Sequence, residues 1–182
     1  MDMASVFMGV VTIQRLAELL WARRNSTRLL TAGGIEFGRA HYPLMVAVHA
    51  SWLGAMWAAG RGHAVDSLFV IAYVALQAGR FWVLITLGCR WTTRVIVIPG
   101  LQPLTRGPYR LVNHPNYWIV AGEIAVVPLA LGLPLYAILF SLLNFIVLAI
   151  RIPIENAAQA WASSQDNIQA PLKANLGAGN PS

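Results

Sequence analysis

Long apolar runs alternate with short polar segments along the chain, and the lengths of these runs predict helices. A helix that spans a bilayer needs about 20 consecutive, mostly apolar residues, and several runs approach that length. The predicted spans are approximately residues 5–21, 43–59, 67–87, 115–132 and 134–150. The pattern predicts an all-α integral membrane protein with about five transmembrane helices.

The last two spans are predicted to form a helical hairpin. Residues 115–150 carry a single charge, at Glu123, and one helix over the whole stretch would overshoot a bilayer. Gly132 and Pro134 break the run near its middle. The chain therefore turns back there and ends on the same side of the membrane as the segment before residue 115.

One membrane-embedded domain is expected over residues 1–162. Residues 163–182 are rich in Gly, Asn, Pro and Gln, a composition that favours a flexible tail. The single cysteine, Cys89, cannot form an internal disulfide and reads most simply as a small apolar residue near a helix end.

Composition supports the membrane interpretation. Hydrophobic residues make up 57% of the chain and charged residues 11%, against about 25% charged in soluble domains. The net charge of +6 does not indicate nucleic-acid binding, because the basic residues fall in every second segment between apolar runs, as the positive-inside rule predicts. These residues are Arg23, Arg24, Arg28, Arg39, Arg90, Arg94, Arg106, Arg110, Arg151 and Lys173.

The same rule predicts an orientation in the bacterial cytoplasmic membrane. The amino terminus carries only Asp2, and arginines follow the first apolar run, which is not the order of a cleaved signal peptide. We expect a retained first helix with its amino terminus outside, and the basic segments facing the cytoplasm. The first helix is expected to end near residue 21, before a polar loop over residues 22–41.

Several charges lie inside or beside the predicted spans. Arg15 and Glu18 are three residues apart and share a helix face, so they can pair with each other or with neighbouring helices. Arg80 needs a partner within the membrane, and Glu18 and Glu123 are the candidates. In the 22–41 loop, Glu36 and His41 could reach a ligand headgroup, although solvated loop positions are the default for both.

The segment Gly107-Pro-Tyr-Arg-Leu-Val-Asn-His-Pro-Asn-Tyr117 indicates a small-molecule site. Asn113 or His114 can cap a helix there, and Pro115 suits its first position. The unpaired N–H groups of such a helix start attract an anionic ligand group. The site is predicted at the mouth of a membrane helix.

Two further segments flank this one. Residues 88–114 form a long connector broken by Pro and Gly, and β-branched residues between Arg90 and Pro99 favour an extended strand. After the last span comes Arg151-Ile-Pro-Ile-Glu155, where Pro153 stops or kinks the helix. If the helix continues, Arg151 and Glu155 share a face, and an ordinary ion pair is the simplest role for them. A cytoplasmic pocket is expected between residues 88–117 and this carboxyl-terminal segment.

Taken together, these spacings resemble the isoprenylcysteine carboxyl methyltransferase family of integral-membrane enzymes. The flanking sequence is similar to that of a bacterial branch that accompanies type III polyketide synthases and O-methylates long-chain alkylpyrones. The segments that carry this similarity are Arg90-Trp-Thr-Thr-Arg-Val-Ile-Val-Ile-Pro99 and Glu155-Asn-Ala-Ala. The resemblance is strongest over residues 90–158 and extends more weakly over most of the chain.

The resemblance implies S-adenosyl-L-methionine as methyl donor, a lipid-like acceptor from the bilayer, and a functional link to a type III polyketide synthase, with no metal. It implies that Arg151 binds the acceptor, that Glu155 binds the donor, and that His114 acts as a base or positions the donor. The donor-binding residues that it implies are Gln102, Pro103, Leu104, Tyr109, His114, Pro115, Asn116, Tyr117 and Glu155.

The chemistry of these residues suits such roles. The donor's carboxylate fits the N–H groups at the helix start, and tyrosines at 109 and 117 can stack on its adenine or approach its sulfonium. Methyl transfer needs alignment more than proton chemistry. Our hypothesis is that Arg151 pairs with an ionised enol oxygen, and that His114 takes a proton only if the acceptor arrives neutral.

The sequence departs from the family pattern at Asn113, where an arginine is common, and at Asn156, where a second glutamate is common. Loss of a cation beside the site favours a neutral or enolic oxygen over a carboxylate acceptor. The alternatives are carboxyl methylation of an isoprenylcysteine-like substrate, another methyl acceptor such as a phospholipid amine or a thiol, or a different class, a small membrane transporter or scaffold. For transport, the sequence offers few deep charges and no visible inverted repeat.

Overall fold

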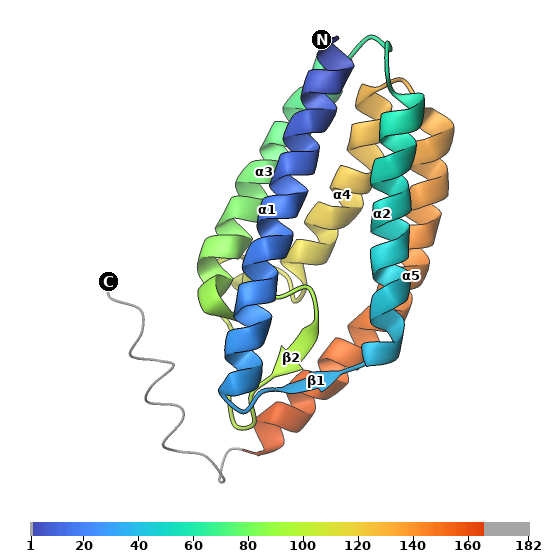
Figure 1. Ribbon diagram of the computed structural model, residues 1–182. Helices are drawn as coiled ribbons and strands as arrows, with labels where there is room; N and C mark the ends of the chain where they lie inside the picture. Colours follow the sequence, from blue (N-terminus) through green and yellow to red (C-terminus); the bar gives the residue numbers. More distant parts are fainter. Residues whose placement is uncertain (1, 166–182) are drawn as a thin grey trace.

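Five long helices form an elongated bundle in the computed structural model, which describes residues 2–165 (Figure 1). The helices are α1 (Met3–Thr31), α2 (Tyr42–Ala59), α3 (Ser67–Leu87), α4 (Pro115–Ala130) and α5 (Pro134–Ser164). Two short strands, β1 (Ile35–Phe37) and β2 (Val95–Val97), pair with each other. The predicted all-α architecture is confirmed, and so is the hairpin of α4 and α5.

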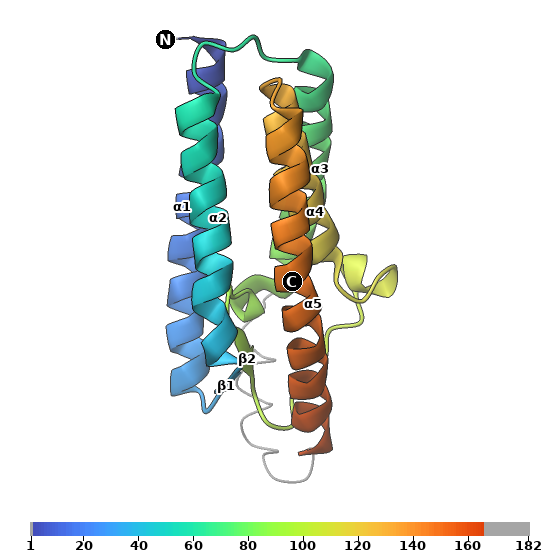
Figure 2. The ribbon, with the colours of Figure 1, turned by 90° about the vertical axis from the view of Figure 1, so that its right-hand side faces the viewer.

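Three of the helical segments are long and apolar enough to cross a membrane: Met3–Thr31, Ser67–Arg90 and Pro134–Ser164. The shorter helices α2 and α4, of 18 and 16 residues, lie beside them in the same bundle (Figures 1 and 2). Large apolar side chains such as Ile71 and Phe145 are exposed on the outside of the bundle. A lipid-facing surface requires such side chains, whereas a soluble protein would avoid so many.

The predicted end of the first helix is wrong, because α1 continues past residue 21 to Thr31. The residues after Trp21 are polar, but none before Gly33 is a glycine or proline, so nothing interrupts the helical backbone. Two of the polar side chains also find buried partners. Asn25 donates to the Trp91 carbonyl (2.9 Å), and the Ser26 hydroxyl donates to the Ala22 carbonyl (2.8 Å).

The fifth helix also runs further than predicted. Pro153 lies inside α5 and neither ends nor restarts it. A proline removes one backbone hydrogen bond, and neighbouring helices can compensate for that loss. Ser163 and Ser164, predicted as the start of the tail, belong to this helix. The rest of the predicted tail, residues 166–182, lies outside the described residues.

A charged cluster ties α1, α3 and α4 together inside the bundle. The Glu123 carboxylate accepts hydrogen bonds from Arg15 (2.7 Å), Arg80 (2.9 Å) and Gln77 (2.7 Å). Arg80 also pairs with Glu18 at 2.5 Å, so both predicted partners of this arginine are correct. Glu123 is fully buried and Arg80 is 4% exposed. Buried charges of this kind are stable only when each has a partner, as they have here.

The strands form a two-stranded antiparallel sheet in which Ile35 lies opposite Val97. The extended segment predicted after Arg90 is thereby confirmed. Glu36, predicted by default as a solvated loop residue, instead lies in β1, where its side chain is 3% exposed and pairs with Arg39 (3.0 Å) and Arg94 (3.2 Å).

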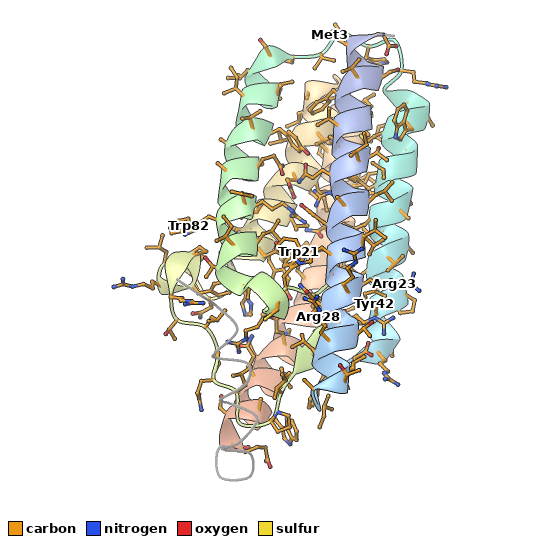
Figure 3. All side chains as sticks on the ribbon, turned by 60° about the vertical axis from the view of Figure 1, so that its left-hand side comes forward. Met3, Trp21, Arg23, Arg28, Tyr42 and Trp82 are labelled. Atoms are coloured by element: carbon orange, nitrogen blue, oxygen red, sulfur yellow. The ribbon has the colours of Figure 1, made fainter. Side chains whose placement is uncertain are left out.

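Most of the basic residues gather at one end of the bundle, whereas the turn around Gly62 lies at the other end, where the Gly62 N–H donates to Asp2 (2.9 Å). Figure 3 shows Met3 at one end of α1, with Arg23 and Arg28 toward the other, near Tyr42 at the start of α2. The small sheet and the last turns of α5 lie at this same end (Figure 1). We call it the basic end.

Candidate functional site

A cavity of about 410 Å³ lies at the basic end, enclosed by the connector before α4, strand β2, the start of α4 and the second half of α5. We call it the basic-end cavity. The predicted site residues that line it are Pro103, Leu104, Tyr109, His114, Asn116, Tyr117, Arg151 and Glu155. Residues separated by up to 52 positions in the sequence, Pro103 and Glu155, are thus brought to one place, as the predicted pocket requires.

The Tyr117 hydroxyl lies between Arg151 and Glu155. Arg151 Nε donates to the Tyr117 oxygen (2.7 Å), and the Tyr117 hydroxyl donates to Glu155 Oε2. The guanidinium also lies 5.7 Å from the centre of the Tyr117 ring. The simple interpretation of Arg151 and Glu155 as a direct ion pair is therefore wrong, because a phenol separates the two charges. This arrangement holds both side chains on one face of α5.

His114 lies beside this chain of contacts. Its ring stacks on that of Tyr117, with centroids 5.2 Å apart and planes inclined by 19°. Its Nε2 lies 2.9 Å from the Asn156 side-chain oxygen, and its Nδ1 lies 3.7 Å from Glu155 Oε1. The amide at Asn156, where the family pattern has a glutamate, therefore orients the imidazole. Gln159 also donates to Glu155 (3.3 Å).

The helix start is partly as predicted. α4 begins at Pro115, and His114 occupies the cap position, but its side chain makes no capping hydrogen bond. The imidazole is held by Asn156 instead. The Tyr117 N–H, which the sequence left unpaired, donates to the His114 carbonyl (3.1 Å). Fewer free N–H groups therefore face a ligand than the sequence predicted.

The connector forms the opposite wall. Burial raises the pKa of the Tyr109 phenol above its ordinary value, and the nearby Glu155 carboxylate raises it further, so the hydroxyl stays protonated. Of the other predicted residues, Gln102 and Pro115 do not belong to the described lining. The Gln102 carbonyl accepts from Arg90 (2.7 Å), which does line the cavity, and Pro115 is buried in the first turn of α4.

Gly107 explains why the Gly-Pro-Tyr segment needs a glycine. Its φ of 58° is a left-handed conformation that side chains with a Cβ rarely adopt. A Cβ at this position would also lie 2.5 Å from the hydroxyl oxygen of Thr86 at the end of α3. The close approach positions the turn that presents Tyr109 to the cavity.

A second cavity, of about 310 Å³, lies within the bundle next to the first. We call it the bundle cavity. Its walls come mainly from α1, α2, α4 and α5 and are largely apolar, including Leu16, Val46 and Val147. Arg151 lines it on the side of the basic-end cavity, and Arg151 Nη1 lies 3.2 Å from the sulfur of Met45. The two cavities share the lining residues Trp91, Thr92, Asn116, Tyr117 and Arg151.

Two buried polar atoms on the shared wall are unpartnered. Trp91 Nε1 and Asn116 Oδ1 have no hydrogen-bond partner within residues 2–165. A buried donor or acceptor without a partner costs stability, and ligand-binding sites are places where such atoms are kept. One donor and one acceptor are therefore available where the cavities meet.

Several site residues were missed by the sequence analysis. Gln159 lies four positions after Glu155, so a search along the same helix face would have found it. Trp91 stood in the segment that carried the family resemblance, but nothing marked its indole as a wall of both cavities. Met45 had no signal, because only the packing of α2 against α5 brings it to Arg151. Within the described residues, no group of three or more His, Cys, Asp or Glu side chains could hold a metal.

The fold and the paired cavities define a membrane-embedded helical protein with one chamber open to polar ligands and one suited to an apolar ligand. The model of the isoprenylcysteine carboxyl methyltransferase (ICMT) family matches residues 68–160, and the chain belongs to this family.

Comparison with individual proteins adds one relative. The "Uncharacterized protein YpbQ" of Bacillus subtilis (strain 168) is 32% identical over 158 residues, which cover 84% of this chain and 94% of that protein. No solved structure matches. Family membership implies a membrane methyltransferase, and members of this family in general use S-adenosylmethionine.

Proposed function

We propose that this protein transfers a methyl group from S-adenosyl-L-methionine to an oxygen of a lipophilic acceptor, a long-chain alkylpyrone or a related phenolic or enolic lipid. The observation that supports this proposal is the junction of the two cavities. The basic-end cavity offers polar and charged side chains, the bundle cavity offers apolar walls, and Tyr117 and Arg151 belong to both. A polar donor and a lipid acceptor can therefore meet at one wall.

The residues of the basic-end cavity fit the donor. Glu155 can accept hydrogen bonds from its ammonium or ribose, and the unpartnered oxygen of Asn116 can accept another. The stacked rings of His114 and Tyr117 present an aromatic surface to an adenine or a sulfonium. When bound, S-adenosylmethionine supplies an electrophilic methyl group. The protein needs only to align the acceptor with it.

Arg151 is the residue that we assign to the acceptor. Its guanidinium lies at the boundary of the cavities and meets a phenol oxygen and a thioether rather than a carboxylate, so its charge is available to an anionic oxygen. An acidic enol already carries that charge at neutral pH. His114 positions the donor in this scheme, and its hydrogen bond to Asn156 keeps the ring in place.

The proposal includes an orientation and a partner. The basic end faces the cytoplasm, and the amino terminus lies outside, as the arginine-rich segments at this end favour. A type III polyketide synthase would supply an alkylpyrone acceptor. Carboxyl methylation of an isoprenylcysteine-like substrate is the second candidate, because Arg151 can also pair with a carboxylate. The absence of a second cation at Asn113, where the family commonly has an arginine, favours the enolic acceptor.

A test uses the purified protein with methyl-labelled S-adenosylmethionine and a panel of alkylpyrones, alkylresorcinols and prenylcysteines. We expect label in an alkylpyrone, at the enolic oxygen by mass spectrometry. Label only in prenylcysteine carboxylates would support the second candidate. No transfer to any acceptor, with the donor bound, would contradict both.

The variant Arg151→Ala tests whether this residue serves the acceptor rather than the donor. We expect acceptor turnover to fall by roughly 100-fold, the loss of a charge-assisted contact of about 3 kcal/mol, while calorimetry shows donor affinity changed little. Arg23→Ala, an exposed arginine on α1, is the matched control and should change neither quantity. Loss of donor binding in Arg151→Ala would reassign this residue to the donor.

A further inference from the structure

The lining of the bundle cavity includes a side-chain oxygen that has no hydrogen-bond partner among the described residues. Asn144 lies on the inward face of α5 and is 2% exposed. It lines the cavity, and its Oδ1 is buried without a hydrogen-bond partner in the described part of the chain. Polar side chains within a membrane helix are costly and usually functional. A leucine would fill this position without leaving an amide oxygen unsatisfied.

The depth of Asn144 follows from helix geometry. It precedes Arg151 by seven residues on a continuous helix, so the two lie about 10 Å apart along the axis. On α2, Trp52 follows Met45 by seven residues, and Met45 contacts Arg151. Because α2 and α5 run in opposite directions (Figure 1), Trp52 and Asn144 lie at the same level.

A second unpartnered atom lies at this level. The Arg15 guanidinium sits over the Trp52 ring, 6.0 Å from its centre, and Arg15 also lines the bundle cavity. Its terminal nitrogens pair with Glu18 and Glu123, but its buried Nε has no partner among residues 2–165. One unpartnered acceptor and one unpartnered donor therefore belong to residues that line this cavity, whose other polar lining residues include Glu18, His49 and Arg80.

These atoms select the chemistry of a ligand. The amide oxygen of Asn144 needs a donor, and the Nε–H of Arg15 needs an acceptor. A hydroxyl group supplies both, whereas an unsubstituted alkyl chain supplies neither.

We propose that the acceptor carries a hydroxyl group on its chain, about 10 Å from the reacting oxygen, and that Asn144 recognises it. The inference rests on the proposed function, because it assumes that the reacting oxygen lies at Arg151 and that the chain lies in the bundle cavity. It narrows the substrate class from a plain alkyl lipid to an oxygenated one. Asn144 is then a specificity-determining residue.

The experiment compares two labelled 4-hydroxy-2-pyrones of equal chain length, one with a chain hydroxyl at the matching distance and one without. Binding of each to the protein in lipid nanodiscs is measured by equilibrium dialysis, without turnover. The variants are Asn144→Leu, which keeps the branched shape of the side chain and removes the amide, and Leu142→Ala, a lipid-facing control on the same helix that is 60% exposed in the native protein. Each variant is compared with wild type, so differences in the partitioning of the probes cancel.

We expect the hydroxylated probe to lose about tenfold in affinity in Asn144→Leu, the effect of one buried hydrogen bond, while the plain probe binds as well or better. Leu142→Ala should alter neither. An equal change for both probes, an unchanged preference in Asn144→Leu, or no binding of either probe overturns the inference. If the preference follows the expectation but no label passes from the donor to either probe, methyl transfer to these lipids is contradicted, whereas the recognition of a chain hydroxyl by Asn144 is kept.

Discussion

Two charged groups, one inside the bundle and one at the basic-end cavity, differ in how completely their charges pair with each other. In the cluster of Arg15, Glu18, Arg80 and Glu123, each arginine meets carboxylates and each carboxylate meets arginines. At the basic-end cavity, a phenol separates the cation on α5 from the carboxylate one turn later. The first group is closed in the sense that its four charges pair with one another, with only the Nε of Arg15 unpartnered, and it joins helices. The second keeps its charges available, as a ligand site requires.

The largest loss of stability is expected when a carboxylate is removed from the buried cluster of Arg15, Glu18, Arg80 and Glu123. Glu123→Gln leaves Arg15 and Arg80 with only Glu18, and loss of one partner from a buried ion pair costs about 3–5 kcal/mol. We expect a large fall in the thermal unfolding temperature in detergent. The matched control is Glu36→Gln, whose partner arginines are 73% and 42% exposed and remain solvated, at a cost of about 1 kcal/mol or less. Equal losses in the two variants would contradict the contrast.

The opposite pattern is expected at the open group. Glu155→Gln should leave the unfolding temperature nearly unchanged and weaken donor binding by roughly 10- to 100-fold, since a hydrogen bond to a charged group contributes about 1.5–3 kcal/mol. Calorimetric titration with S-adenosylmethionine measures the affinity. A folded variant that binds the donor like the wild type would remove Glu155 from the site.

A smaller loss of stability is expected from Gly107→Ala, about 1–3 kcal/mol for a left-handed residue with a Cβ, together with weaker donor binding as the turn shifts from Thr86. Gly62→Ala is the control, because Gly62 has a similar φ of 76° but no atom within 4 Å of an added Cβ. Thermal unfolding of both variants separates backbone strain from the contact. If only the strain matters, the two variants will lose the same stability.

The smallest expected effect is a pH dependence at His41, whose two ring nitrogens are unpartnered in the described structure. Burial, and then the Arg151 charge, lower the pKa of His41 below its ordinary value of 6.5. The unfolded chain therefore binds the proton more readily, and stability is complete above about pH 6.5 and declines as the pH falls below it. His41→Gln should flatten that decline in thermal unfolding. An identical pH profile in the variant would exclude this residue as its source.

The sequence predicted most of the architecture because apolar length is a strong signal in a membrane protein. It predicted α1 too short, because the drop in hydrophobicity at Arg23 was taken as the end of the helix. Hydropathy reports where the lipid ends, whereas a helical backbone can continue through polar residues when no glycine or proline interrupts them. Pro153 is predicted to stop or kink the last helix, but it lies inside α5, which continues to Ser164.

The site was predictable in part for a similar reason. His114, Tyr117, Arg151 and Glu155 stand in segments whose spacing is informative, and the structure brings them together. Asn144 is different, because a single amide in an apolar run has no local pattern. Only the three-dimensional placement of its unpartnered oxygen distinguishes it from a packed side chain.

The lengths of α1 and α5 set the height of the site. With 29 and 31 residues, they measure about 43 and 46 Å at 1.5 Å per residue, against a hydrocarbon layer of about 30 Å. Both begin at the end opposite the small sheet (Figure 1), so their final turns extend beyond the hydrocarbon layer. The small sheet lies between these turns and covers the basic-end cavity on the water side. The bundle cavity lies at the level of the lipid. In the proposed function, the charged methyl donor and the apolar acceptor would each occupy the cavity whose surroundings suit it.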